Sequence, residues 1–373
     1  MEVLTRNTLV FRLVIFCLLG GLAATGFSQT QGQAKPQGLI ARPPVTRMQG
    51  PKIGLIEFYG LHKITEAKLR AALGVHEGDF LPRSKGEAEE RIDGLSGIVE
   101  SHLESVCCEA GNMILFVGIE EKGAAHFDLR EPPDGEAKLP EEVTTLYRRF
   151  IESSKTAARA GITAEDLTHG HALSADPETR DIEEQFVPVA KQYLPELRSI
   201  LRNSSDEEQR AMAAYMIGYA PDKRDIVDDL QYALKDADAG VRFNATRGLK
   251  ALAVFTRLNS DSSVKIEPTW FIEMLNSLSF TDRNQALGVL QILTDPKGTQ
   301  RGDDSVLGQL RDRALSSLVE MARWKSLNYA LPAFVLVGRL TDLTDSQVQD
   351  AWARGDRESV IAKAMAAAKK KKS

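Results

Sequence analysis

The stretch LQYALKDADAGVRFNATRGLKAL, residues 230–252, decides the fold of this chain. Apolar and small residues return at helical spacing on both sides of an aspartate-rich turn, which predicts two helices joined by a short connection. An aspartate before a helix accepts hydrogen bonds from the first free amides, so both aspartates are expected to cap the second helix. The positions that define this unit are Leu230, Leu234, Asp236, Asp238, Val241, Arg242 and Ala245.

A second copy of the unit lies 32 to 33 residues earlier in the chain. It places Leu197, Leu201, Arg210 and Ala213 at the equivalent positions. The repeated unit resembles the HEAT-like helical repeats, in which each helical hairpin has an apolar face that only a stacked neighbour buries. The resemblance implies a mainly α protein, an α-solenoid whose helical groove binds protein partners.

The HEAT-like repeats are expected to fill residues 194–365. Beyond the two clear copies, weaker copies are expected at residues 271–293 and at residues 307–321, the latter around Arg313-Ala314. A last apolar helix is predicted at residues 331–340.

Arg210 and Arg242 occupy the same position in the two clear copies, just after the polar turn. We interpret both as structural, each guanidinium reaching a neighbouring turn, because arginine makes several directed hydrogen bonds at once. The small side chain of Ala245 lets paired helices approach closely. The alternative is a basic ladder of these arginines that binds an anion along the concave face.

A small α/β unit is predicted ahead of the repeats, in residues 52–122. A strand that ends before Gly60 comes first, and two stretches of helical spacing follow it. Strands at residues 102–108 and 113–120 close the unit, and alternate residues of the last strand are expected to face one side. The predicted order is therefore β-α-α-β-β.

That order and several turn and core residues resemble a POTRA domain, over about one fifth of the chain. The resemblance implies contact with polypeptides in the cell envelope, made by lending a sheet edge. The residues that carry it are Ile53, Ile56, Phe58, Gly60, Leu61, Gly78, Asp79 and the end of the final strand, Glu120-Glu121.

Residues 123–193 predict a helical connector with one long helix at residues 140–160. A short helix at residues 164–167, a loop, and a helix start at Asp176-Pro177 are expected next. His169 and His171 invite a metal hypothesis, but zinc needs three or four ligands and only aspartates lie nearby. We expect no metal site, and a tight turn at the glycine between the two histidines.

The first 28 residues are typical of a signal peptide, because two arginines precede an apolar run at residues 13–24 that small residues follow. Cleavage is expected, and the alternative is an uncleaved membrane anchor. Residues 29–51 are rich in Gln, Gly and Pro and predict a flexible linker. The chain is therefore expected to be exported, periplasmic or secreted, and to meet the membrane only through an uncleaved signal segment.

Composition argues against nucleic acid as a partner. The formal net charge is −5, and the only dense basic run is residues 369–372, in a tail at residues 366–373 that we interpret as solvated. No nucleophile elbow, zinc-protease helix, phosphate loop or dinucleotide fingerprint occurs, so neither catalysis nor a cofactor is predicted. Cys107 and Cys108 are adjacent on a strand and should face opposite sides, which disfavours a bond between them.

These patterns predict an exported, non-catalytic scaffold that binds protein partners through a helical groove and a sheet edge. A first alternative is a HEAT-like lyase or isomerase, which requires a polar pocket of ionisable groups in the concave face. A second alternative is a membrane-anchored factor of envelope assembly or division.

Overall fold

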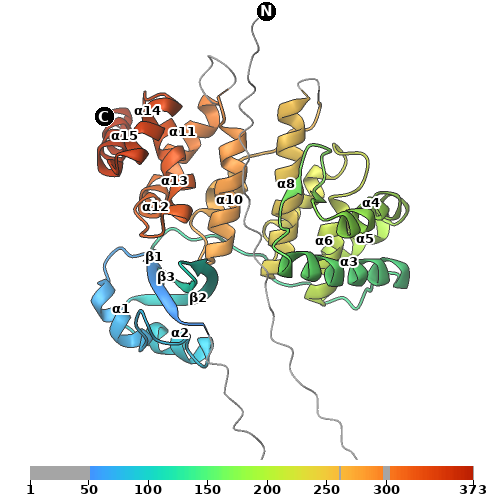
Figure 1. Cartoon of the computed structure of the whole chain (residues 1–373), viewed down its shortest axis with the longest axis horizontal. Coiled ribbons are helices and arrows are strands. Elements are labelled where there is room, and N and C mark those ends of the chain that lie inside the picture. The colour runs from blue at the N-terminus through green and yellow to red at the C-terminus, as the bar shows by residue number, and fades with distance from the viewer. Residues whose placement is uncertain (1–50, 260–261, 297–302, 373) are drawn as a thin grey trace, which may run out of the picture.

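The computed structural model describes residues 51–259, 262–296 and 303–372. The predicted signal peptide and nearly all of the predicted linker lie outside these residues. The described chain is mainly helical, with a small sheet near its N-terminal end (Figure 1). Within these residues, no helix combines the length and apolar character needed to cross a membrane.

The repeats are antiparallel helix pairs that stack side by side, and their second helices α6, α8, α10 and α13 pack in sequence. An N-cap side chain accepts a backbone N–H in the turn of each of the first three pairs, from Asp206, Asp238 and Ser279. The pairs are α5 (Leu194–Asn203) with α6 (Glu207–Ile217), α7 (Val227–Ala233) with α8 (Ala239–Leu258), α9 (Thr269–Met274) with α10 (Phe280–Leu293), and α12 (Leu315–Ala322) with α13 (Leu327–Arg339).

The fourth pair differs from the weak copy predicted at residues 307–321. An additional helix, α11 (Asp304–Arg313), precedes α12, and the second helix of the pair is α13. In the clear copies the arginine lies near the start of the second helix of a pair. Arg313-Ala314 instead lies before the first helix of this pair, although the local sequence resembles that arginine position. The prediction was wrong because α13 carries no arginine near its start.

The sheet module, residues 52–122, has the elements in the predicted order. Strand β3 is central, parallel to β1 and antiparallel to β2. Strand β2 begins four residues before the predicted start. The elements are β1 (Ile53–Tyr59), α1 (Glu66–Leu73), α2 (Lys85–Asp93), β2 (Ile98–Glu109) and β3 (Asn112–Glu121).

Both faces of this sheet are buried, whereas the sequence predicted one. Leu115 and Val117 join the core under α1 and α2. On the other face, Phe116 stacks on Phe280 of α10 with ring centroids 3.7 Å apart and also contacts Trp324. The sheet module therefore packs directly on the C-terminal repeats, as Figure 1 shows.

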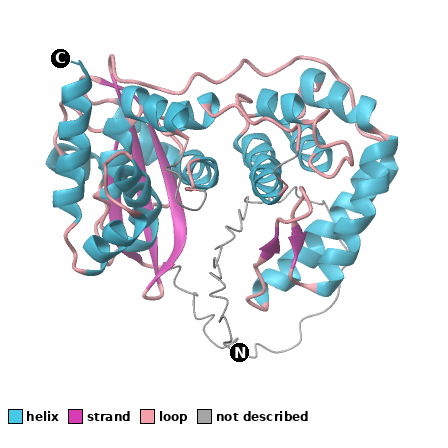
Figure 2. Ribbon diagram, turned by 90° about the horizontal axis from the view of Figure 1, so that it is seen from above, coloured by secondary structure: helices cyan, strands magenta, loops and turns pink. Residues whose placement is uncertain are grey.

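An extended segment then carries the chain back to the first repeat. We call residues 124–139 the strap, and Figure 2 shows it crossing the molecule as a loop. The N–H of Arg130 donates to Lys235 O at 2.7 Å, and Gly135 O accepts the N–H of Ser205 at 2.7 Å. A Cβ on Gly135 would lie 2.3 Å from Asn203 O, so only glycine fits here.

The connector after the strap contains α3 (Glu141–Arg159) and α4 (Pro177–Gln192), close to the predicted bounds. Between them, β4 (Glu165–Asp166) pairs with β5 (Leu173–Ser174) in a small hairpin. The predicted short helix at 164–167 was wrong, because the Asp166 carboxylate accepts the Thr168 amide and turns the chain.

Helix α15 (Arg357–Lys372) follows α14 (Asp345–Ala353) and extends through the basic run of the predicted tail, where Lys369 is exposed. One further expectation is corrected. Cys107 and Cys108 are joined in a disulfide. The β2–β3 register is irregular between Val106 and Glu109, so strand alternation does not hold at the cysteines.

Candidate functional site: a groove where the sheet meets the repeats

Arg210 and Arg242 belong to a series of buried ion pairs between successive repeats. The Arg210 guanidinium, 2% exposed, donates to both Asp236 carboxylate oxygens at 2.9 Å. Arg242 Nε donates to both Asp282 carboxylate oxygens at 2.9–3.0 Å, and its Nη1 donates to Asp236 O. Arg283 continues the series to Glu320 at 3.3 Å. We call these three arginines and their partners the arginine ladder.

The ladder explains the remaining repeat positions. Asp238 caps α8 by accepting the Val241 amide at 2.9 Å, and both Val241 and Ala245 are fully buried. Asp236 is not a helix cap as expected, because its carboxylate already accepts the Asp238 amide and the Arg210 guanidinium. The ladder arginines are occupied within the chain, so the alternative of an anion-binding basic ladder is contradicted.

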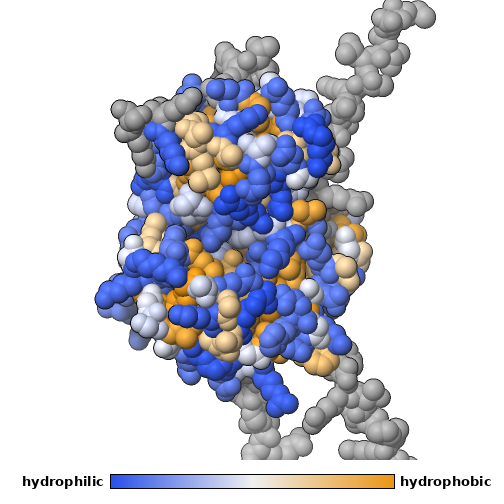
Figure 3. Space-filling model, turned by 90° about the vertical axis from the view of Figure 1, so that its left-hand side faces the viewer, coloured by the Kyte–Doolittle hydropathy of each residue, from blue (hydrophilic) through white to orange (hydrophobic). Residues whose placement is uncertain are grey.

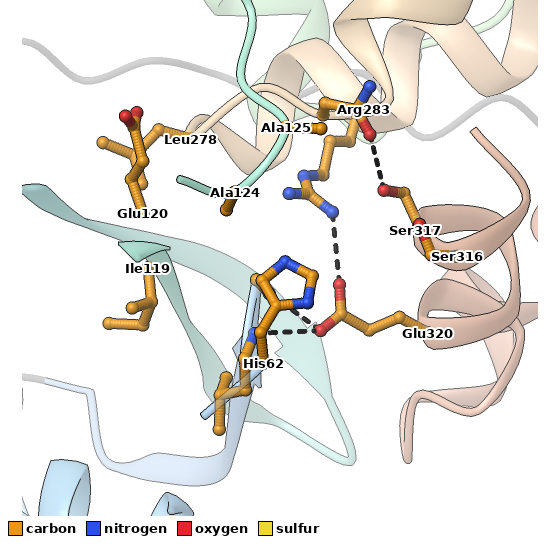
Figure 4. A pocket seen from close by; sticks show the side chains of 13 residues that line it. His62, Ile119, Glu120, Ala124, Ala125, Leu278, Arg283, Ser316, Ser317 and Glu320 are labelled. Atoms are coloured by element: carbon orange, nitrogen blue, oxygen red, sulfur yellow. Dashed lines mark hydrogen bonds and ion pairs between the residues drawn. The ribbon is translucent and has the colours of Figure 1, made fainter. Parts of the chain in front are cut away.

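The ladder ends where the sheet module begins. Glu320 Oε1 accepts the backbone N–H of Gly60 at 2.7 Å and of Leu61 at 3.4 Å, while Oε2 faces Arg283 (Figure 4). Gly60 has a φ of +80°, and a Cβ there would lie 2.0 Å from Ile119 O. A small cavity of about 120 Å³ adjoins this contact. The sequence flagged Gly60 as a turn but gave no sign of the distant carboxylate.

Three more hydrogen bonds fix the junction. The Tyr59 hydroxyl donates to Leu278 O at 2.7 Å, and Glu104 accepts from the hydroxyl of Thr281 at 2.6 Å. Glu57 of β1 accepts the Lys325 amide at 2.8 Å. Burial raises the pKa of Glu57 to about 7, and hydrogen bonds from the Lys325 and Ser326 amides oppose the rise.

Beside the junction lies a groove of about 720 Å³, which we call the junction groove. Its walls come from the end of β1, from α11 and α12, and from α15. Figure 3 views this side and shows apolar side chains on the upper helices and on the sheet module below, with charged side chains around them. Its apolar lining residues are Phe58, Leu61, Leu315, Val319, Trp324, Met365 and Ala368.

Charged side chains edge the same groove. Arg313 pairs with Glu273, and Arg323 pairs with Glu358 at 2.8 Å. The Nε of Arg311 and the indole Nε1 of Trp324 are buried donors that find no acceptor among the described residues. The groove therefore combines an apolar floor with cationic side chains and two unsatisfied donors.

A second group of ionisable side chains lies under the β4–β5 hairpin, and the sequence did not predict it. Glu183 accepts from Tyr215, Tyr219 and Arg247 at 2.8–3.0 Å, and Arg247 also pairs with Glu165. These groups satisfy one another and hold the hairpin against α6 and α8. The lyase alternative requires ionisable groups that line a pocket. Here the ionisable groups are bonded to one another instead.

Burial lowers the pKa of two residues beside this cluster, Lys223 and His171. It lowers the pKa of Lys223 to about 8, and it lowers the pKa of His171 to about 4 together with the positive charge of Lys223. Lys223 Nζ lies 3.3 Å from His171 Nδ1. His169 instead faces Asp166 at 3.3 Å, and Asp176 caps α4. Among the described residues, no group of three or more such ligands is placed to hold a metal ion.

The family model for HEAT repeats matches residues 194–264, which span α5 to α8. This confirms HEAT repeats in the stretch from which the fold was predicted, a little under a fifth of the chain. A search of curated proteins found no match.

Proposed function

We propose that this chain is an exported, non-catalytic scaffold of the cell envelope or periplasm that binds a protein partner in the junction groove. The observation that carries the proposal is the groove itself, a largely apolar hollow of about 720 Å³ beside the hydrogen-bonded junction. Exposed apolar surface rimmed by polar residues marks interaction sites on proteins. HEAT repeats also commonly mediate contacts between proteins, and export is proposed from the signal-like residues 1–28.

The POTRA-like character of the sheet module is part of the proposal, and its strand order supports it. The two edge strands of the sheet are less accessible to a partner than the groove, because some of their backbone groups are already hydrogen-bonded. On β1, Ile53 exchanges hydrogen bonds with Gly78 and Asp79. On β2, the outward amide of Leu103 donates to Glu89 Oε1 at 2.7 Å. Lending a sheet edge is therefore the smaller part of the proposed function.

Site-specific photocrosslinking tests the proposal. A photoreactive residue is placed at Leu315 or Met365 in the groove, and at the exposed Leu258 as a control. We expect the two groove positions to capture the same one or two envelope proteins and Leu258 to capture neither. N-terminal sequencing of the fractionated chain tests export. An unprocessed cytoplasmic chain, or equal capture at all three positions, refutes the proposal.

A further inference from the structure

The charge of the junction groove restricts its occupant. Four cationic side chains line it, Arg311 and Arg313 on α11, Arg323 after α12 and Lys369 on α15. The pairs that Arg313 and Arg323 make with Glu273 and Glu358 lie near the surface, where ion pairs are weak and exchange readily.

The carboxylates that line the groove offset this charge only in part. Glu320 is engaged by Arg283 and by two backbone amides of the sheet module. Glu57 accepts the Lys325 amide, and its raised pKa of about 7 leaves it partly protonated near neutral pH. Asp312 is the remaining carboxylate. Four cations therefore stand against three carboxylates in the lining, and with Glu57 partly protonated the lining residues carry a small net positive charge.

Two residues that line the groove also carry buried donors without acceptors in the described part of the chain. The Arg311 Nε and the Trp324 Nε1 find no acceptor among the described residues, although Trp324 is only 1% exposed. A buried donor without an acceptor is destabilising, and buried polar groups in folded proteins are nearly always paired.

The floor of the groove fits apolar side chains spaced along one face of a helix. Leu315 and Val319 are four residues apart on α12 and so lie on one face. Met365 of α15 faces them across the groove and is 41% exposed. Methionine adapts its shape to an incoming apolar surface.

We propose that the junction groove binds an acidic amphipathic helix of a partner protein. This inference rests on the proposed scaffold function and names the chemistry of its partner. The apolar face of the helix packs on Leu315, Val319 and Met365, and its carboxylates face the four cations of the rim. The chain's own residues 29–51 are unsuited, because they carry Lys35, Arg42 and Arg47 and no acidic residue.

The test uses two fluorescent peptides of about 18 residues, or five helical turns, and the full chain. Both have leucine every third or fourth residue among alanines, and they differ only in carrying Glu or Lys on the polar face. We expect the acidic peptide to bind about tenfold or more tightly than the basic one in fluorescence anisotropy, with weaker binding as salt rises.

Variants on one helix supply the matched control. Lys369→Glu changes a groove residue, whereas Lys363→Glu makes the same charge change at an exposed position of α15 outside the groove. We expect Lys369→Glu and Met365→Asp to weaken the acidic peptide about tenfold, and Lys363→Glu to leave binding unchanged.

Three outcomes overturn the inference: equal or tighter binding of the basic peptide, binding of neither peptide, and equal effects of the two lysine variants. Binding of the chain to anionic phosphatidylglycerol vesicles that Lys369→Glu abolishes would instead assign the groove to a membrane surface. Photocrosslinking at Leu315 and Met365 is judged separately. If those positions capture a protein but the acidic peptide is not preferred, the scaffold function stands and only the proposal of an acidic helix is refuted.

Discussion

Glu57 is a buried carboxylate on which the sheet and the repeats meet. Its side chain is 6% exposed and accepts the Lys325 amide across the junction. Burial raises its pKa from 4.5 to about 7. The folded chain therefore binds a proton at this site over a pH range in which the unfolded chain has already released it.

This difference predicts a pH dependence of stability. As the pH rises from about 4.5 to about 7, Glu57 should lower the free energy of unfolding by an amount on the order of 3 kcal/mol, and the loss should level off above that range. Glu57→Gln mimics the protonated acid and should lack this contribution. Urea denaturation of both proteins from pH 4 to pH 8 measures the difference, and parallel pH profiles would contradict the assignment.

The arginine ladder gives a second prediction for single residues. Arg242→Ala leaves the Asp282 carboxylate, 2% exposed, without its cation, and should cost about 3–5 kcal/mol. Arg323→Ala removes an ion pair at the surface and should cost less than about 1 kcal/mol. Urea denaturation measures both. A double variant that also carries Asp282→Ala should recover part of the loss, and a cost for Arg242→Ala as small as that of the control would rule out the ladder as a structural device.

Among the elements, local periodicity predicted the helices of the clear repeats and the order of the sheet module. The hairpin at β4 and β5 was missed, because two strands of two residues have no periodicity to read. The burial of the second face of the sheet could have been predicted from the sequence. Residues 113–119 are almost continuously apolar, and Ile114 and Phe116 alternate with the residues assigned to the core. Such a run is typical of a strand buried on both faces.

The packing of β3 on the repeats depends on Gly118. A Cβ there would lie 2.2 Å from Leu278 O and 2.7 Å from the Tyr59 hydroxyl. Gly118→Ala should therefore separate the sheet module from α10 without unfolding the module. Gly308→Ala on α11, where nothing lies within 4 Å of the added carbon, is the matched control.

Hydrogen exchange measures this prediction. In Gly118→Ala, the amides of Gly60 and Lys325, which are bonded across the junction, should lose protection, while those within the sheet keep it. Unchanged protection of the two junction amides would show that the alanine is accommodated.

At the scale of the whole molecule, sequence reasoning left open whether the two parts touch, and long-range contacts decide it. Tyr59 and Leu278 are 219 residues apart and Glu57 and Lys325 are 268 apart, yet each pair is hydrogen-bonded. No local pattern encodes such partners. The junction groove was unpredicted for the same reason, since its walls come from both ends of the described chain.

Removal of the sheet module should therefore damage the repeats. Deletion of residues 51–122 uncovers Phe280 and Trp324, and we expect a red-shifted emission of Trp324 and a lower melting temperature. The background Trp270→Phe and Trp352→Phe leaves Trp324 as the single indole reporter. A deletion of residues 1–50 in the same background is the control and should change neither value. An unshifted emission would show that the repeats fold independently.

The contact of the first folded element with the last helices has a consequence for folding during synthesis. A chain that emerges from its N-terminus presents β1 and β3 long before Phe280 and Trp324 exist to cover Phe116. The aromatic side of the sheet must stay open until nearly the whole polypeptide is available, and loops of more than 200 residues must then close. Packing of the sheet module on the repeats is thus a late step of folding, and until then the Phe116 face of the sheet is a surface that a holding chaperone can shield.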